Sequence, residues 1–436
     1  MSLDATAVGL ALFFILIGYL GLGVWIFAGL VLVAATGLYL LAGFNPTRIG
    51  FILQSITFSA ATRWELAAIP MFVWMGELMF RTDISERLFR GLSPLVAVLP
   101  GKLIHVNIAG CTLFAAVSGS SAATTATVGR ITIRSLIERG YDRNLSIGSL
   151  AGAGSLGLLI PPSIVLIVYG VLGEVSIAAL FIAGIVPGIM TAAIYMTYIG
   201  LVATFRKGIT PADEPVYGWR DRLNGLVTLI PVFILVGTVI GILYSGVATP
   251  SEAGAVGAFV ALVTVIVTGQ FSFRLLRDSV LSTVATSAML CTILVAASFL
   301  STAIGYLHVP ATVASQIAAL DLGPYGLILV LAIFYVLLGM FLEGVSITVM
   351  TLPITLPLVI AAGWDPVWFG IFLVIMVEMA QITPPIGFNL FILQSLSGDS
   401  ILKVTKAAFP FFLILCLSAF LLVLFPDIAL FLPRQL

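Results

Sequence analysis

Charged side chains are scarce in this sequence, and their scarcity excludes most soluble folds. Of 436 residues only 9% are Asp, Glu, Lys or Arg, whereas soluble domains average about 25%. The 19 basic and 19 acidic residues cancel, so no basic surface indicates a nucleic-acid partner. Hydrophobic residues make up 61% of the chain instead and give a mean hydropathy of +1.21.

Cysteine and histidine are rare as well, which argues against metal and nucleophile chemistry. The three cysteines, Cys111, Cys291 and Cys416, lie singly in apolar segments, with neither metal-ligand spacing nor a disulfide framework. No HExxH motif occurs, and the serine-rich stretch at 118–121 has no suitably placed histidine to activate a hydroxyl. We predict no enzyme activity and no cofactor.

Long apolar runs are what the sequence has in abundance. Runs of about 20 residues recur along the whole chain, and each is long enough to cross a hydrocarbon layer about 30 Å thick. The short alternating segments of a β-barrel are absent. The first run lacks a basic preceding segment and a clear cleavage site, so we do not interpret it as a removed signal peptide. The pattern predicts an all-α polytopic protein in a lipid bilayer.

The basic residues divide this apolar chain into crossings. Lys and Arg are enriched in cytoplasmic loops, and two clusters of them stand at 81–102 and 130–143. The segment between, 103–129, is too short for two crossings of about 20 residues each. We therefore predict a re-entrant helical hairpin at 103–129 with its tip at the sequence SGSS, residues 118–121.

The remaining charges assign the later segments. We predict that 149–174 crosses outward and that 176–203 returns to a polar cytoplasmic loop. Two further crossings follow, and no Lys or Arg then occurs from 278 to 402, so the loops of that stretch are assigned outside. Arg48 and Arg63 fit this scheme poorly.

A motif recurs in the two halves of the chain at a constant offset. Asp142 of the sequence GYD stands 19 residues before Pro161, and Asp365 of GWD stands 19 residues before Pro384. The step from Asp142 to Asp365, called the repeat offset below, therefore equals the step from Pro161 to Pro384. Each of these prolines opens a Pro-Pro pair within an apolar run. Both halves of the chain thus carry a span that two prolines interrupt.

The repeat offset predicts a second hairpin. Residues 326–352 correspond to the first hairpin, with Glu343 opposite Ser120. The first hairpin has basic flanks and the second has none, so the two should enter the membrane from opposite sides. Such inverted-topology repeats are the plan of many secondary transporters.

These patterns divide the chain into six parts. The predicted parts are N-terminal scaffold helices (1–80), a first inverted repeat (81–203) with hairpin 103–129 and broken helix 149–174, a cytoplasmic connector (204–225), scaffold helices (226–300), a second inverted repeat (301–402) with hairpin 326–352 and broken helix 367–395, and a C-terminal helix (403–436).

The interrupted spans predict a binding site at mid-membrane. Non-helical backbone at that depth is tolerated only where protein or a water-filled cavity surrounds it. The carbonyl groups freed by each break suit a cation such as sodium, and helix N-termini suit an anionic substrate. A plain proline kink and small-residue packing faces are the alternatives left open.

Two acidic residues are candidates for this site, because burying a carboxyl group in a membrane is costly. Glu343, at the second tip, is a candidate ion ligand or proton carrier. Glu378, six residues before Pro384, either braces the second break or makes a structural hydrogen bond within the bundle.

Several longer stretches resemble a known family. SGSSAATTATVG from Ser118, RGYDRNLSIGSLAGAGSLGLLIPPSIVLIVYG from Arg139 and EMAQITPPIGFNLF from Glu378 are similar to the large membrane subunit of TRAP (tripartite ATP-independent periplasmic) transporters, within the ion transporter superfamily. IPMFVWMGELM and TPSEAGAVGAF fit the same family. The likeness covers nearly the whole chain.

The resemblance implies an elevator-type transporter in the cytoplasmic (inner) membrane of a bacterium or archaeon. It implies sodium-coupled import of a small organic acid anion. The implied partners are a small four-helix membrane subunit and a periplasmic substrate-binding protein. Because the sequence shows no fused four-helix extension, we expect the small subunit to be a separate polypeptide.

Carried over residue by residue, the resemblance gives two sets of candidate residues. The sodium-binding set comprises Ser118, Gly119, Ser120, Ser121, Gly157, Pro161, Glu343, Gly344, Ser346, Thr383, Pro384 and Gly387. The substrate-binding set comprises Ser121, Pro162, Ser163, Pro385 and Asn389. Family members commonly carry Asp at the position of Glu343, and we expect the longer side chain to reshape the second ion site.

Two rival functions remain at this point. A stand-alone sodium/carboxylate symporter of the same superfamily would share the hairpins but need no binding protein. A channel would conduct without coupling. Uptake measured with and without periplasmic extract distinguishes the stand-alone symporter from a TRAP transporter, and electrical recording distinguishes the channel. The residues do not name the substrate.

Overall fold

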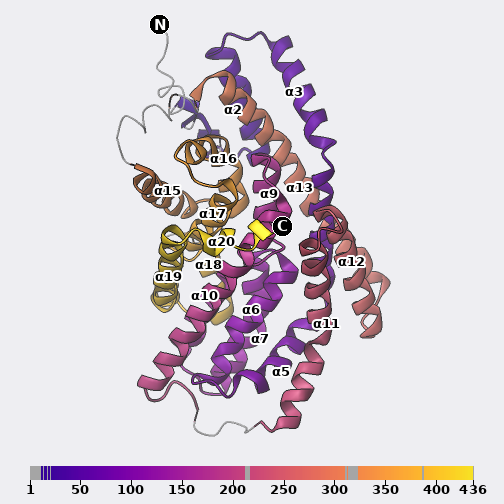
Figure 1. Cartoon of the computed structure of the whole chain (residues 1–436), viewed down its shortest axis with the longest axis vertical. Coiled ribbons are helices and arrows are strands. Elements are labelled where there is room, and N and C mark those ends of the chain that lie inside the picture. Colours follow the sequence, from indigo (N-terminus) through magenta and orange to yellow (C-terminus); the bar gives the residue numbers. More distant parts are fainter. Residues whose placement is uncertain are drawn as a thin grey trace.

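The fold is helical throughout the part of the chain that the structure describes (Figure 1). This computed structural model describes residues 11–12, 14–16, 18–19, 21–211, 217–309, 312, 323–384 and 387–435. No strand occurs among these residues, and six of their helices are long and apolar enough to cross a membrane. The predicted all-α membrane fold is confirmed.

The N-terminal helices pack against three long helices from the middle of the chain. These elements are α2 (Ile26–Leu40), α3 (Pro46–Ala61), the short η1 (Trp64–Ala67), α4 (Ala68–Phe80), α11 (Trp219–Tyr244), α12 (Pro250–Val267) and α13 (Phe273–Tyr306). α4 packs on α12 and α13, and α13 also packs on α2 and α3. Together they correspond to the residues predicted as the scaffold.

Side-chain caps fix where two of these helices begin. Asn45 accepts the Arg48 N–H at 2.8 Å at the start of α3. Thr249 and Glu252 form a capping box at the start of α12, where Pro250 takes the first helical position. These oxygens satisfy N–H groups that the first turn of a helix leaves unpaired.

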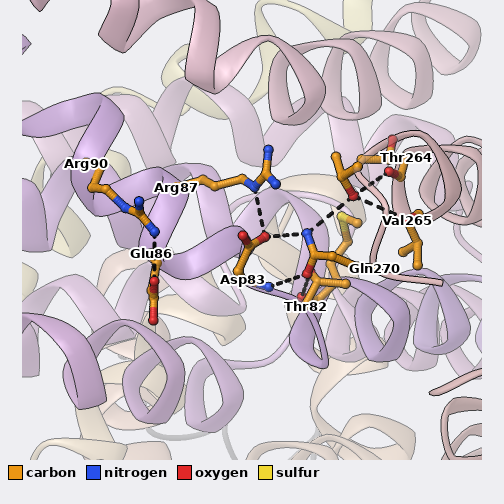
Figure 2. A network of polar contacts seen from close by, with 10 residues as sticks. Thr82, Asp83, Glu86, Arg87, Arg90, Thr264, Val265 and Gln270 are labelled. Atoms are coloured by element: carbon orange, nitrogen blue, oxygen red, sulfur yellow. Dashed lines mark hydrogen bonds and ion pairs between the residues drawn. The ribbon is translucent and has the colours of Figure 1, made fainter. Parts of the chain in front are cut away.

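A polar network ties the turn after α4 to the turn before α13 (Figure 2). Arg87, on the amphipathic helix α5 (Ile84–Val96), donates to Asp83 Oδ1 at 2.8 Å. The Asp83 N–H donates to Gln270 Oε1 at 2.8 Å, and Gln270 Nε2 donates back to the Asp83 carboxylate. Partial burial of Asp83 opposes ionisation, but the hydrogen bonds from Arg87 and Gln270 outweigh it and hold the pKa of this carboxyl below its usual range.

Asp83→Asn is expected to lower the melting temperature of the purified protein near neutral pH. A carboxyl group with a depressed folded-state pKa stabilises the fold above its unfolded pKa of about 3.9, and this contribution is lost as pH falls through the folded pKa. Because the side chain is 38% exposed, we expect a loss below about 1 kcal/mol. Melting in detergent at about pH 6 and about pH 3 checks this; a difference from the parent that does not shrink in acid contradicts it.

The first half continues with a hairpin and an interrupted helix. Its elements are η2 (Lys102–Ile104), α6 (His105–Ser118), α7 (Ser121–Glu138), α8 (Arg143–Gly154), η3 (Ser155–Gly157), α9 (Ile164–Gly173) and α10 (Ile177–Phe205). A two-residue turn joins α6 to α7, at the predicted tip. The helical path stops after η3 and resumes at α9, and the first Pro-Pro pair lies in between.

The second half repeats this order of elements. They are α15 (Gly323–Gly339), α16 (Gly344–Ala361), α17 (Pro366–Gln381), α18 (Phe388–Ser397) and α19 (Ile401–Leu424), followed by α20 (Asp427–Leu430) and η4 (Pro433–Gln435). α16 and α17 begin where the repeat offset carries the starts of α7 and α8, whereas α18 and α19 begin one position later than the starts of α9 and α10 predict. Figure 1 shows α6 and α7 below the centre of the view and α15 and α16 above it. Opposite insertion of the two hairpins in a membrane stays a prediction.

Four predicted part boundaries fall inside continuous helices. The boundaries at 203/204, 225/226, 300/301 and 402/403 lie within α10, α11, α13 and α19. The boundaries at 225/226 and 402/403 were placed next to charged residues, which mark the membrane surface rather than the end of a helix. α13 runs for 34 residues, so it joins the predicted scaffold to the second repeat without a loop at the boundary.

The two arginines that fitted the charge scheme poorly both have partners. The Arg48 guanidinium lies 3.6 Å from the centroid of the Phe44 ring. Arg63 donates to the Val171 carbonyl at 2.7 Å and pairs with Glu174 at 3.0 Å, at the end of α9. Arg63 therefore joins the segment between α3 and η1 to the helix that follows the first break.

Candidate functional site

The tip of the first hairpin is a tight turn that requires glycine. α6 ends at Ser118, Gly119 takes a φ of 61°, and Ser120 is the N-cap of α7. A Cβ atom on Gly119 would lie 2.7 Å from the Pro162 carbonyl oxygen, so no other residue allows this approach. The Ile164 N–H also donates to the Gly119 carbonyl at 3.3 Å. The tip is therefore fastened to the first break.

The first break presents its backbone to that tip. Its non-helical residues, 158–163, are all buried. A Cβ atom on Gly157 would lie 2.5 Å from Ser121 Cα and 2.9 Å from the Ser120 carbonyl oxygen. Carbonyl oxygens of unwound segments of this kind coordinate sodium in secondary transporters. The oxygens crowded around Gly119 and Gly157 thus fit the chemistry of a sodium site.

The second tip carries an acidic cap. Glu343 is the N-cap of α16, and its Oε1 accepts the Val345 N–H at 3.2 Å. Its side chain is exposed, whereas Gly344 and Ser346 are buried. A carboxylate at a helix N-terminus interacts favourably with the helix dipole. The structure therefore gives Glu343 a capping role at the position that Ser120 holds in the first hairpin.

The second break gathers carbonyl oxygens around a glycine. Thr383 Oγ1 donates to the Met379 carbonyl at 2.6 Å, and the Gly387 N–H donates to the Thr383 carbonyl at 3.1 Å. A Cβ atom on Gly387 would lie 2.7 Å from the Gln381 carbonyl oxygen and 2.8 Å from that of Thr383. Glycine is needed here because a side chain would occupy the space that these oxygens surround.

A cavity of about 230 Å³ lies between the two tips. Helix α13 of the predicted scaffold closes one side of it with Thr286, Met289 and Leu290. The residues of the predicted sets that line it are Gly119, Ser120, Ser121, Glu343 and Gly344. Both hairpins therefore face one space, which also borders the scaffold.

Four helices begin at this cavity. Their first residues, Ser121 of α7, Ile164 of α9, Gly344 of α16 and Phe388 of α18, all line it. The N-terminus of a helix carries unpaired N–H groups and the positive end of the helix dipole. No Lys, Arg or His stands among the described lining residues. The polar groups that the described lining offers to an anion are therefore backbone N–H groups rather than basic side chains.

The other predicted residues lie next to the cavity rather than in its lining. Ser163 caps α9 and accepts the Leu166 N–H at 3.5 Å. Pro385 lies outside the described residues. The remaining predicted residues outside the lining are Ser118, Gly157, Pro161, Pro162, Ser346, Thr383, Pro384, Gly387 and Asn389.

Two polar residues of the second half reach across to the first hairpin. Glu378 Oε2 lies 2.9 Å from Ser121 Oγ, and Glu378 Oε1 accepts the Leu158 N–H at 2.9 Å. Asn389 Nδ2 donates to the same Ser121 hydroxyl at 2.6 Å. Glu378 and Asn389 are both fully buried. Of the two predicted roles for Glu378, the structure supports a hydrogen bond within the bundle, and its partners belong to the first hairpin and the first break.

The sequence did not indicate the α13 residues or Gln381, which also lines the cavity. Thr286, Met289 and Leu290 lie in a long apolar helix with no break, charge or motif beside them. Gln381 is the last residue of α17 and precedes the Pro-Pro pair by only a few positions, so its nearness to a break was the one available signal.

Comparisons with known proteins agree with this architecture. A family described as "Tripartite ATP-independent periplasmic transporter, DctM component" matches residues 12–428. The C4-dicarboxylate TRAP transporter large permease protein DctM of Pseudomonas aeruginosa is 34% identical over 402 residues, covering 90% of this chain and 91% of that protein. The ectoine TRAP transporter large permease protein TeaC of Halomonas elongata is 33% identical over 374 residues, covering 84% and 86%.

A solved structure shares the fold at low sequence identity. The YdaH transporter of Alcanivorax borkumensis superposes with a TM-score of 0.65 at 15% identity, covering 94% of this chain and 97% of that one. This similarity concerns the fold. The sequence matches concern the family, and together with the membrane-length helices they identify a transporter component and not an enzyme.

The matched family extends over both hairpins, both breaks and the scaffold helices. Its members are permease components of transporters that have three parts and reside in the inner membrane. The chain belongs to the DctM family of large permease components of TRAP transporters.

Proposed function

We propose that this chain imports a small carboxylate-bearing solute in symport with sodium, by an elevator-type movement of the hairpins and interrupted helices against the scaffold. A small membrane subunit and a periplasmic binding protein complete the transporter. The convergence of four helix N-termini on one cavity that lacks basic side chains among its described lining residues carries this proposal. Such a cavity attracts an anion through backbone dipoles.

Helix α18 is the one of these four helices whose N-cap residue has no side chain. Ser120, Ser163 and Glu343 each accept a backbone N–H of the helix they precede. Gly387 precedes α18 and has no side chain to do so. The first N–H groups of α18 therefore suit a substrate carboxylate, and the family resemblance implied substrate binding by Asn389 of the same helix.

Two sodium sites are proposed beside the breaks. The first would draw on the Ser120 and Pro162 carbonyls near Gly119 and Gly157, and the second on the Gln381 and Thr383 carbonyls near Gly387. Bound sodium would supply the positive charge that the cavity lining lacks, so the substrate would bind tightly only with the ion. This dependence is a physical basis for coupling.

The substrate class follows from chemistry that two relatives share. The names of these relatives specify C4-dicarboxylate and ectoine, and both solutes carry a carboxylate group. A volume of about 230 Å³ suits solutes of this size. Membership of the TRAP family favours delivery by a binding protein over the stand-alone symporter considered above.

Ser120→Leu and Thr383→Leu are expected to abolish sodium-dependent uptake while membrane insertion and assembly persist. Each leucine places a bulky apolar side chain where oxygen atoms face a proposed ion site. Uptake is measured in vesicles that contain both membrane subunits and the binding protein, with succinate and ectoine as the probes, in sodium and in choline medium.

Thr197→Leu serves as the matched control, because Thr197 is exposed on α10 and bonds only its own helix, at the Ala193 carbonyl. Uptake by this variant should equal that of the parent. Sodium-dependent uptake that persists in Ser120→Leu refutes the first ion site, and persistence in Thr383→Leu refutes the second.

A further inference from the structure

One buried carboxyl group, that of Glu378, links the two halves of the chain. Glu378 lies in the last turn of α17, where every residue from Trp368 to Gln381 is buried. Its two oxygens contact different elements, Ser121 at the start of α7 and the Leu158 N–H in the first break. It makes no ion pair among the described residues, and no Lys or Arg occurs between 278 and 402.

The Ser121 hydroxyl group that Glu378 contacts has two further hydrogen-bond partners. Ser121 Oγ also lies 2.9 Å from the Gly154 carbonyl oxygen, at the end of α8, and accepts from Asn389 Nδ2. Glu378 precedes the second break and Asn389 follows it. Both sides of the second break therefore hold the tip of the first hairpin against the first interrupted helix.

The residues related to Glu378 and Ser121 by the repeat offset do not form an equivalent contact. The repeat offset carries Glu378 back to Ser155, which donates to the Gly152 carbonyl at 2.6 Å and lies 3.2 Å from Tyr195 Oη. The same offset carries Ser121 forward to Gly344, which has no side-chain donor or acceptor. In the described part of the second tip, no carboxylate from the first half therefore makes hydrogen bonds like those of Glu378.

From this asymmetry we infer that Glu378 is a positioning residue for the first ion site, held in place by the second half of the chain. Its two hydrogen bonds fix the start of α7 and the amide of Leu158, which is the neighbour of Gly157. The distance between the Ser120 and Pro162 carbonyls, and thus the sodium affinity of the first site, depends on Glu378. The second site does not depend on it. This inference rests on the proposed sodium coupling.

Two matched cysteine reporters separate the sites. Ala122→Cys and Val345→Cys are related by the repeat offset, one in the first turn of α7 and one in that of α16, and both positions line the cavity. Each reporter is introduced after Cys111, Cys291 and Cys416 have been replaced by alanine. Sodium alone, exchanged for choline, is the ligand, and the rate of maleimide labelling measures its binding.

Two replacements of Glu378 separate the effect of its hydrogen bonds from the effects of its side-chain size and its charge. Glu378→Met keeps the size of the side chain and removes both hydrogen bonds, so the sodium concentration that half-protects the Ala122→Cys thiol should rise about tenfold. Glu378→Gln keeps a carbonyl for Leu158 and a donor for Ser121, so this concentration should stay within about threefold of the parent. The sodium concentration that half-protects the Val345→Cys thiol should not change with either replacement. Glu378→Leu, which also removes both hydrogen bonds, provides the same test if Glu378→Met does not accumulate.

Other outcomes overturn the inference. If Glu378→Met leaves the sodium concentration that half-protects the Ala122→Cys thiol unchanged, the two hydrogen bonds of Glu378 do not position the first ion site. A Gln variant as impaired as the Met variant shows that the charge, not the geometry, matters. Equal shifts at both reporters indicate a general loss of structure. If sodium protects neither thiol in the parent, the proposed sodium coupling fails and the inference fails with it.

Buried hydrogen bonds elsewhere provide a control for nonspecific loosening. Tyr335→Phe removes bonds to Thr351 and Thr355 between α15 and α16, within the second hairpin and away from its tip. If positioning by Glu378 is specific, Tyr335→Phe leaves the Ala122→Cys titration unchanged. A shift as large as that of Glu378→Met would contradict the inference.

Discussion

Replacing Gly157 with alanine is expected to abolish uptake. The new Cβ atom would lie 2.5 Å from Ser121 Cα and 2.8 Å from its backbone nitrogen. Backbone atoms at a helix start have no alternative rotamer, so the first break and the first tip must separate. Overpacking of this kind costs about 1–3 kcal/mol. We expect the protein to fold and the Ser120 and Pro162 carbonyls of the proposed first ion site to move apart.

The measurement is sodium-dependent uptake in vesicles that contain the complete transporter, together with the yield of monodisperse protein. Gly241→Ala on α11 is the control, because a Cβ atom there meets nothing within 4 Å, and alanine favours a helix over glycine by about 1 kcal/mol. Uptake by Gly241→Ala should match the parent. Normal uptake by Gly157→Ala would show that close contact between the tip and the break is dispensable.

Crosslinking residues 63 and 174 is expected to stop transport. Arg63 belongs to the predicted scaffold, whereas Glu174 lies at the end of α9, and their side chains meet at 3.0 Å. A cavity of about 530 Å³ beside this pair is lined by both residues, by Pro250 of α12 and by residues of α9 and α10. An elevator-type movement must part these two groups. A covalent link between them should therefore hold the transporter in one state.

The test uses Arg63→Cys/Glu174→Cys on a background without native cysteines, and a reducible bifunctional thiol reagent about as long as the two original side chains. Uptake should fall to the level of empty vesicles and return with reductant. Arg81→Cys/Ser282→Cys is the control, because Arg81, the C-cap of α4, donates to Ser282 of α13 at 2.7 Å, and both helices belong to the predicted scaffold. Equal inhibition of both pairs, or of neither, would refute relative movement at Arg63.

The positions of the tips and breaks were predictable because they depend on local backbone chemistry. Ser120 and Glu343 were placed opposite each other by the repeat offset, and both are N-caps of the helices that follow the tips. Asp142 and Asp365, which define that offset, are the N-caps of α8 and α17. Caps and prolines act within one helical turn, so their spacing survives in the sequence.

Helix ends away from such signals were not predictable. α13 continues past the boundary at 300/301 because its apolar residues give no reason to stop. The sequence did not place Arg63 either, because its partners Val171 and Glu174 are far from it along the chain. A rule that assigns loops to a side of the membrane by their charge cannot predict that a basic side chain pairs with an acidic residue far away in the sequence.

The sequence by itself determined the membrane class, the two hairpins with their tips, the two interruptions and the family to which the chain belongs. Only the tertiary structure decided which of these parts meet: Glu378 and Ser121 are 257 residues apart, and α13 closes a cavity between the tips. Helix starts and breaks follow from interactions among near neighbours in the chain. Contacts between distant segments follow from how whole helices pack, which no short stretch of residues records.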